Sequence, residues 1–172
     1  MKRILVLGSA GAGKSTFARQ LGERLGLETI HLDSHYWQPN WTGTPPEEWE
    51  RRVKELAQRP AWVMDGNYRS SLPLRLPYAD TVIFLDRSRA RCLLRCFGRL
   101  LKHRGRNRPE LPLGCNEKID REFFQWIWNY PRDVRPGIIE TLGTLTDKEV
   151  VILRMDREID EFLARQCDHS SS

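Results

Sequence analysis

A glycine-rich segment near the N-terminus constrains the fold more than any other part of the sequence. Residues 8–15 read G-S-A-G-A-G-K-S, directly after the apolar run 4–7 and at the start of a helical pattern over 14–25. A strand, a loop with the spacing G-x-x-x-x-G-K-S and a helix are typical of a phosphate-binding loop. The glycines let backbone N–H groups approach phosphate oxygens, and the helix N-terminus presents partial positive charge to the same anion. The segment therefore predicts a nucleoside triphosphate site.

Each part of this loop has an expected role. Lys14 would reach the β- and γ-phosphates as a catalytic residue, and the Ser15 hydroxyl would ligate Mg²⁺. The residues expected to hold ATP are Gly8, Ser9, Ala10, Gly11, Ala12, Gly13, Lys14, Ser15 and Thr16. The alternative, a glycine-rich turn that binds nothing, is disfavoured because both flanking segments are of the required type.

Five short apolar segments alternate with helical patterns along the chain. The segments are 3–7, 29–32, 61–64, 81–85 and 150–153, and helices are expected at about 14–25, 45–58, 88–102, 117–130, 136–143 and 157–166. This alternation predicts an α/β protein with the P-loop NTPase fold, in which helices cover both faces of a five-stranded parallel sheet. At two helix starts we expect side-chain caps, a capping box from Thr44 to Glu47 and an N-cap at Ser88.

The length of 172 residues suits one domain, which we expect over 1–168 with a disordered tail at 169–172. Two mobile inserts are expected within it, an acceptor-site insert at about 34–60 and a lid at about 103–118. No apolar run approaches the roughly 20 residues of a membrane span, and a cleavable signal peptide would remove the glycine-rich loop. We therefore expect a cytoplasmic protein without membrane contact; its oligomeric state is not indicated. Reduced thiols, mostly buried, are expected at Cys92, Cys96, Cys115 and Cys167.

Aspartates follow three of the expected strands. In parallel α/β sheets, ligands bind at the carboxyl ends of the strands. Asp65 is expected to ligate Mg²⁺ together with Ser15, and Asp33 to orient a Mg²⁺-bound water or to accept a proton from an acceptor hydroxyl. For Asp86 a turn or cap role is favoured, and for His31 a structural one.

A strongly basic stretch runs from Arg87 to Arg108. It contains nine Lys and Arg residues and no acid, whereas the whole chain has a net charge of +5. Arg95 and Arg99 are four residues apart, hence on one helix face, and Arg104, Arg106 and Arg108 follow in the expected lid. Because guanidinium groups stabilise a transferring phosphoryl group, we expect Arg95 and Arg99 to be catalytic and the lid arginines to contact ATP. The alternative is contact with a nucleic-acid backbone, which is possible but not favoured.

Aromatic residues gather in the acceptor-site insert, which holds Tyr36, Trp37 and Trp41. They could stack on a ring-bearing acceptor, or they could form a small satellite core under a long loop. The sequence leaves these two alternatives open.

These segments resemble the nucleoside monophosphate kinases of the adenylate kinase type. Residues 65–69 (D-G-N-Y-R) are similar to the D-G-F-P-R segment of those enzymes, where the Asp lies near Mg²⁺ and the Arg contacts the acceptor phosphate. The resemblance implies acceptor-site roles for Asp65, Gly66 and Arg69, and phosphate contacts for the Arg95 and Arg99 pair. Residues 33–37 (D-S-H-Y-W) differ from the T-G-D-x-L-R segment that grips AMP, so AMP is not assumed as the acceptor.

Over about 2–165 the chain more closely resembles an adenylate-kinase-related group called the DNA topology modulation proteins. The segments that carry this resemblance are 31–37 (HLDSHYW), 62–68 (WVMDGNY), 107–110 (NRPE) and 114–118 (GCNEK). It implies ATP- and Mg²⁺-dependent phosphoryl transfer to a small acceptor such as a nucleotide or nucleoside. The sequence has no recognisable helicase, nuclease or topoisomerase site. The alternatives are an ATP-binding regulator that associates with DNA through 87–108, and a nucleotide-binding protein without turnover.

Overall fold

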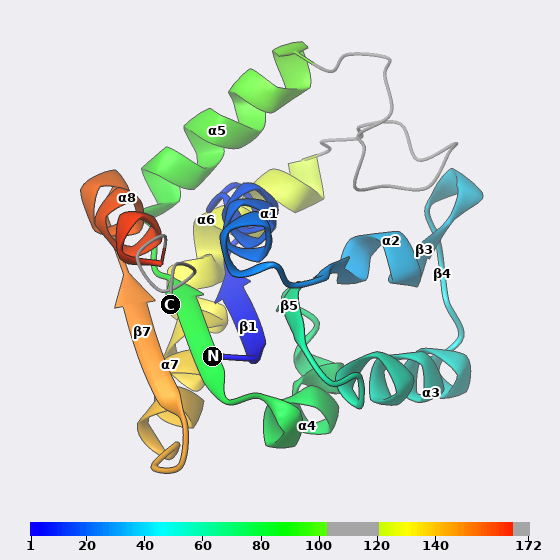
Figure 1. The fold of residues 1–172 in the computed structure, drawn as a ribbon. Coiled ribbons are helices and arrows are strands. Elements are labelled where there is room, and N and C mark those ends of the chain that lie inside the picture. The colour runs from blue at the N-terminus through cyan, green and yellow to red at the C-terminus, as the bar shows by residue number, and fades with distance from the viewer. Residues whose placement is uncertain (103–120, 167–172) are drawn as a thin grey trace.

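One parallel five-stranded sheet organises the protein (Figure 1). The computed structural model describes residues 1–102 and 121–166. The strands lie in the order β2-β5-β1-β6-β7. Their bounds are Arg3–Gly8 (β1), Thr29–His31 (β2), Trp62–Asp65 (β5), Thr81–Leu85 (β6) and Glu149–Leu153 (β7). Each predicted strand is confirmed to within one residue at either end, and so is the predicted sheet.

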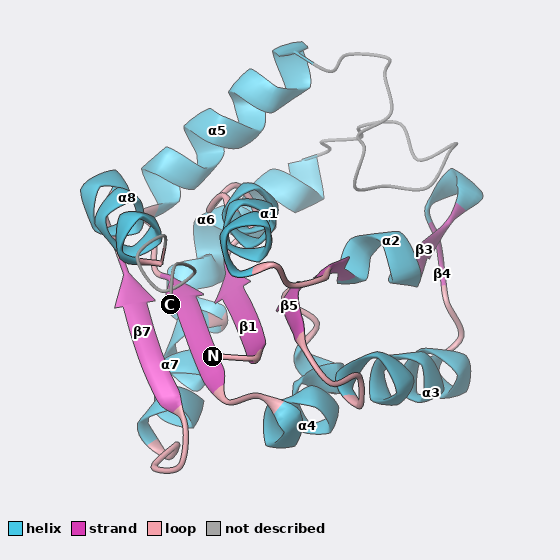
Figure 2. Ribbon diagram, viewed as in Figure 1, coloured by secondary structure: helices cyan, strands magenta, loops and turns pink. Residues whose placement is uncertain are grey.

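Helices cover both faces of this sheet, as predicted (Figure 2). Ile4 and Val6 of β1 pack in one core cluster, whereas Leu5 and Leu7 pack in the other, because successive strand residues point to opposite faces. The cluster around Ile4 and Val6 includes residues of α1 (Lys14–Leu25), α5 (Arg89–Lys102) and α8 (Asp156–Arg165). The cluster around Leu5 and Leu7 includes residues of α3 (Pro46–Ala57) and α7 (Arg135–Gly143). Helix α6 (Arg121–Asp133) contributes residues to both clusters. The glycine-rich loop therefore leaves β1 on the side of α1 and α5.

The segment after β2 is more regular than the sequence indicated. It forms a short helix α2 (Leu32–Tyr36) and a two-stranded antiparallel hairpin of β3 (Trp37–Gln38) and β4 (Thr42–Gly43) before α3 begins. The predicted capping box at Thr44 is wrong, because α3 begins at Pro46 with Pro45 as its N-cap. The Thr44 hydroxyl instead donates to the Tyr36 carbonyl oxygen at 2.6 Å and so ties the end of the hairpin to α2.

The segment between β5 and β6 also contains structure that was not predicted, a helix α4 (Leu72–Arg75) between two single 3-10 turns. The predicted cap of α5 is confirmed, since the backbone N–H of Arg91 donates to the Ser88 hydroxyl at 3.4 Å. The expected lid at 103–118 and the expected tail at 169–172 lie outside the described residues. In the described part of the chain, no helix is long and apolar enough to cross a membrane.

Candidate active site

The glycine-rich loop is packed directly against α5. Gly11 has φ +76, and a Cβ there would lie 2.3 Å from the Cys92 carbonyl oxygen and 2.8 Å from the Cys96 sulfur. Both cysteines are free and buried, as expected, while Cys115 and Cys167 lie outside the described residues. Since a side chain at Gly11 would collide with the α5 backbone, only glycine allows the loop to sit this close to the helix.

The loop ends at Gly13, the N-cap of α1, with φ +96. A Cβ there would lie 2.8 Å from Nη1 of Arg95, so the absent side chain makes room for that guanidinium. Ser15 and Thr16 lie in the first turn of α1, Ser15 half-buried and Thr16 exposed. The first N–H groups of α1 thus face the end of the loop, which is the arrangement that binds phosphates.

The Lys14 side chain folds back into the loop. Its Nζ donates a hydrogen bond to the Ser9 carbonyl oxygen at 2.9 Å. Burial lowers the pKa of the Lys14 ammonium, while the charges of Asp65 and Asp33 act in the opposite direction. The structure therefore brings both candidate carboxylates, which come from separate segments, into electrostatic reach of Lys14.

Asp65 ends β5, the strand next to β1, and is 4% exposed. The parallel register places His31 of β2 opposite it, and Nδ1 of His31 lies 2.7 Å from Oδ1 of Asp65. His31 thus fixes the orientation of this carboxylate, which is more specific than the structural role expected for it. The signal was available in the sequence, since residues that end neighbouring parallel strands meet at one edge of the sheet.

Asp33 lies in the first turn of α2, and a tyrosine holds one of its oxygens. The Tyr68 hydroxyl donates to Oδ1 of Asp33 at 2.8 Å. Burial raises the pKa of Tyr68, and the charge of Asp33 raises it further. The sequence analysis included Tyr68 only in the segments that carry the two resemblances and gave it no role, so its contact with Asp33 is new.

A buried arginine supports the loop that carries Asp65 and Tyr68. Arg75 of α4 is fully buried, and its Nη2 donates to the carbonyl oxygens of Gly66 at 2.9 Å and Tyr68 at 3.3 Å. Burial lowers the pKa of this guanidinium. Arg69 of the same loop is exposed and extends to α7, where its Nη2 lies 3.2 Å from the position of a Cβ at Gly137. The sequence did not single out Arg75, which reads as an ordinary surface charge.

Asp86 directly follows β6, and its side chain forms ion pairs with Arg135 and Arg154 rather than the turn or cap contact that the sequence favoured. It accepts two hydrogen bonds from Arg135 of α7, at 2.7 and 2.8 Å. This bidentate pair fastens α7 to the sheet.

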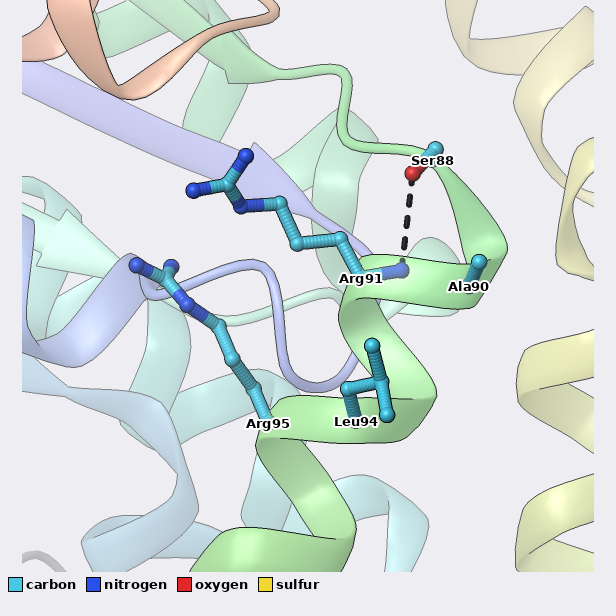
Figure 3. Close-up of a pocket in the computed structure, with 5 residues that line it drawn as sticks. All are labelled: Ser88, Ala90, Arg91, Leu94 and Arg95. Atoms are coloured by element: carbon cyan, nitrogen blue, oxygen red, sulfur yellow. Dashed lines mark hydrogen bonds between the residues drawn. The ribbon is translucent and has the colours of Figure 1, made fainter.

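Two arginines of α5 and one arginine just before it converge on one acidic residue near the C-terminus. Asp156, the first residue of α8, forms ion pairs with Arg87, Arg91 and Arg95. Figure 3 shows Arg91 and Arg95 extending together from α5 to the same side. Arg95 Nη1 also donates to the Ala12 carbonyl oxygen at 3.3 Å, so this side chain bridges α8 and the glycine-rich loop. The basic stretch, which lacks acids in the sequence, therefore has a counter-charge in space.

Fewer contacts are known for the other arginines that the sequence predicted to bind phosphates. The charge of Arg99 acts on Lys14 and contributes to lowering the Lys14 pKa, so it too lies on the side of the loop. Arg104, Arg106 and Arg108 lie outside the described residues, and their contact with ATP stays a prediction.

The aromatic residues of the insert divide into two groups. Trp49 is 4% exposed and belongs to the core, and Tyr36 and Tyr68 pack against that core. Trp37 and Trp41 lie in the hairpin, half-buried, with ring centroids 5.3 Å apart. Trp37 also packs edge-on against Tyr36 at a centroid distance of 4.8 Å, so the two groups are in contact and both alternatives for Tyr36, Trp37 and Trp41 stay open.

Within residues 1–102 and 121–166, no group of three or more His, Cys, Asp or Glu side chains could hold a metal ion by itself. Mg²⁺ is usually bound by one or two protein oxygens together with substrate phosphates. Ser15 and Asp65 could supply such oxygens beside Lys14.

Comparisons with known proteins show the fold. A shikimate kinase from Acinetobacter baumannii in complex with shikimate is 20% identical, with a TM-score of 0.60 over 100% of this chain and 95% of that chain. A shikimate kinase from Bacteroides thetaiotaomicron is 16% identical, with a TM-score of 0.59 over 99% of both chains. A gluconokinase from Sinorhizobium meliloti is 18% identical, with a TM-score of 0.52 over 98% of this chain and 95% of that chain.

No protein-family model matches the sequence, and no curated protein matches it either. The resemblance to the DNA topology modulation group is therefore not confirmed. At these identities the solved structures show the fold alone. The chain has the P-loop kinase fold of shikimate kinase and gluconokinase.

Proposed function

We propose that the protein is a P-loop kinase that transfers the γ-phosphoryl group of ATP to a small acceptor. The observation that carries this proposal is the glycine-rich loop between β1 and α1, with the Lys14 side chain folded into it and Asp65 at the end of the neighbouring strand β5. The charges of Asp65 and Asp33 both act on the Lys14 ammonium. Such a cluster combines a phosphate-binding cation, a metal-binding carboxylate and a base, the parts that phosphoryl transfer requires. The fold likeness to shikimate kinase and gluconokinase supports the proposal.

The nucleotide would be held by the loop and by the start of α1. Lys14 would exchange the Ser9 carbonyl oxygen for β- and γ-phosphate oxygens, and this exchange would restore a full counter-charge to the buried ammonium. Arg95 would turn from the Ala12 carbonyl oxygen to a phosphate, and Arg99 would add positive charge on the same side. The lid arginines Arg104, Arg106 and Arg108 would complete the group that neutralises the transferring phosphoryl.

Ser15 and Asp65 would hold Mg²⁺, with His31 fixing the Asp65 carboxylate. When bound, Mg²⁺ would supply charge neutralisation at the β- and γ-phosphates. Asp33 would accept the proton of the acceptor hydroxyl, and Arg69, beyond Gly66, would contact the acceptor.

The acceptor would be a small molecule, for which a nucleotide or nucleoside is our proposal. A sugar-like acid such as shikimate, the ligand in the neighbouring structure from Acinetobacter baumannii, is the natural comparison. The alternative, a DNA-associated regulator, would need the α5 arginines to face an extended phosphate backbone. Arg91 and Arg95 instead turn to Asp156, and Arg95 also reaches the loop, which favours the kinase.

The test is ADP release from Mg²⁺-ATP with a panel of nucleosides, nucleoside monophosphates, hydroxy acids and duplex DNA. The kinase proposal predicts acceptor-dependent ADP release that falls to background in Lys14→Ala and persists in Lys2→Ala, which removes an exposed lysine from the chain just before β1. Release stimulated by DNA alone would support the regulator instead.

A further inference from the structure

We infer that Arg75 is a positioning residue for phosphoryl transfer, which sets how the proposed base, Asp33, is placed relative to the proposed metal-binding carboxylate, Asp65. This inference rests on the proposed kinase function and adds to it a residue that is fully buried and so acts through others. It follows from the hydrogen bonds of the Arg75 side chain and from the way the loop after β5 meets α2.

The loop after β5 connects the two carboxylates of the site. It begins after Asp65, the last residue of β5, and it reaches Tyr68, whose hydroxyl donates to Oδ1 of Asp33 at 2.8 Å. At its start, Gly66 has φ +143, and a Cβ there would lie 2.7 Å from Cβ of Leu32. The loop backbone therefore packs directly against the residue before Asp33. A shift of this loop against α2 would change the placement of Asp33 relative to Asp65.

One nitrogen of Arg75 holds both ends of this loop. Its Nη2 donates to the carbonyl oxygen of Gly66 at 2.9 Å and to that of Tyr68 at 3.3 Å. Arg75 is the last residue of α4, and Leu72 at the start of the same helix packs against the apolar core. The guanidinium thus extends from an element anchored in the core, and its two hydrogen bonds restrict the movement of the loop.

Packing alone does not account for an arginine at this position. The side chain is fully buried, and its Nε and Nη1 have no hydrogen-bond partner among the described residues. Burial lowers the Arg75 pKa to about 10 against the opposing charge of Asp65, so the guanidinium stays charged at neutral pH. A buried charge that is compensated only in part contributes little to stability and often costs it. The two carbonyl contacts at the edge of the site supply the missing reason.

Phosphoryl transfer is sensitive to this placement. The acceptor oxygen forms a bond to the γ-phosphorus and its proton passes to a carboxylate oxygen of Asp33, while the bond from that phosphorus to the β–γ bridging oxygen breaks and ADP leaves with the electron pair. A misplacement of about 1 Å in such a site can lower the rate by about 100-fold. Loss of the Arg75 contacts should therefore act on kcat. The glycine-rich loop receives no hydrogen bond from Arg75 within the described part of the chain, so ATP binding should change little.

The kinetic experiment compares the wild type with Arg75→Met and Arg75→Lys, using each acceptor of the panel above that the wild type phosphorylates. Arg75→Met removes the charge and the donor, so we expect kcat to fall by about 100-fold with KM for ATP nearly unchanged. Lysine keeps the charge and one donor nitrogen, and one nitrogen makes both contacts, so Arg75→Lys should retain kcat within about tenfold of the wild type. The matched control is Arg157→Met, at an exposed arginine of α8 paired with Glu161, which should change neither constant.

Hydrogen exchange followed by mass spectrometry tests the same inference without turnover. In Arg75→Met the amides of 66–71 and 32–36 should exchange about tenfold faster or more, because the loop and α2 lose a common restraint. The amides of 8–16 should keep their wild-type rates. The midpoint of urea unfolding should stay at the wild-type value or rise, since an apolar side chain replaces a partly compensated charge. Should Arg75→Met fail to fold, Arg75→Gln replaces it in both experiments, with a kcat loss of about tenfold expected for a neutral donor.

Two outcomes would overturn the inference while the kinase function stands. One is an unchanged kcat in the variant without the charge, and the other is faster exchange spread over the whole sheet with a lower urea midpoint, which a merely structural role predicts. If the wild type phosphorylates no acceptor, the proposed function fails and hydrogen exchange decides alone. Faster exchange confined to 66–71 and 32–36 would then still support the role of Arg75 in fixing this loop, and wild-type exchange there would refute it.

Discussion

Two glycines of the same loop should respond very differently to replacement by alanine. At Gly13 and Gly11 the φ values of +96 and +76 are unfavourable for any side chain, by about 1–2 kcal/mol each. At Gly13 the new Cβ meets only the end of the flexible Arg95 side chain. At Gly11 it meets the backbone oxygen of Cys92 at 2.3 Å, which cannot move without shifting α5. Overpacking of this kind adds about 1–3 kcal/mol.

Gly13→Ala should therefore lower the free energy of unfolding by about 1–2 kcal/mol and Gly11→Ala by about 2–5 kcal/mol. Gly26→Ala is the matched control, because Gly26 has φ +64 and nothing within 4 Å of the added Cβ. Urea unfolding followed by tryptophan fluorescence measures all three. Gly13→Ala should also weaken ATP binding by about tenfold, since its methyl displaces the Arg95 guanidinium from the loop. Equal stability of Gly11→Ala and Gly26→Ala would refute the packing of the loop on α5.

Three further changes test other parts of the site and fold. Asp156→Asn should lower the free energy of unfolding by about 1–3 kcal/mol in urea titrations, because three arginines lose a carboxylate, one of them buried. His31→Ala should reduce the Mg²⁺ affinity of the ATP complex by about 10–100-fold, measured from the Mg²⁺ dependence of turnover, and leave Mg²⁺-free ATP binding unchanged. Burial acts to raise the pKa of Asp80, but hydrogen bonds from Thr81, Arg3 and Lys2 outweigh it and lower that pKa. The native contribution of Asp80 is present above its unfolded pKa of 3.8 and lost as pH falls below it, so Asp80→Asn should flatten the acid side of the stability profile.

The sheet could be predicted because each strand carries its own signal. A buried parallel strand reads as a short apolar run, and all five runs end close to turn residues or aspartates. The hairpin of β3 and β4 could not be found in this way, because two-residue strands have no periodicity. The role of Thr44 could not be predicted from local sequence either, since its hydroxyl donates to the Tyr36 carbonyl oxygen and does not cap the helix that follows.

The site was predictable where its residues belong to one segment or end neighbouring strands. The loop residues and Asp65 are of this kind, and their placement beside Lys14 follows from the sheet order. The position of Asp156 could not be predicted in this way, because it pairs with Arg95 across 61 residues of sequence. The burial of Arg75 could not be predicted either, because a single arginine among leucines and prolines has no sequence pattern that distinguishes a buried charge from an exposed one.

The most direct test of phosphoryl transfer at this loop is a ³¹P NMR time course of the wild type and Lys14→Ala with Mg²⁺-ATP and an alcohol acceptor. The proposal predicts a new phosphate-ester resonance in the wild type that grows in step with ADP, and no such resonance in Lys14→Ala. Appearance of inorganic phosphate without any ester, or ester formation at an unchanged rate in Lys14→Ala, would contradict it.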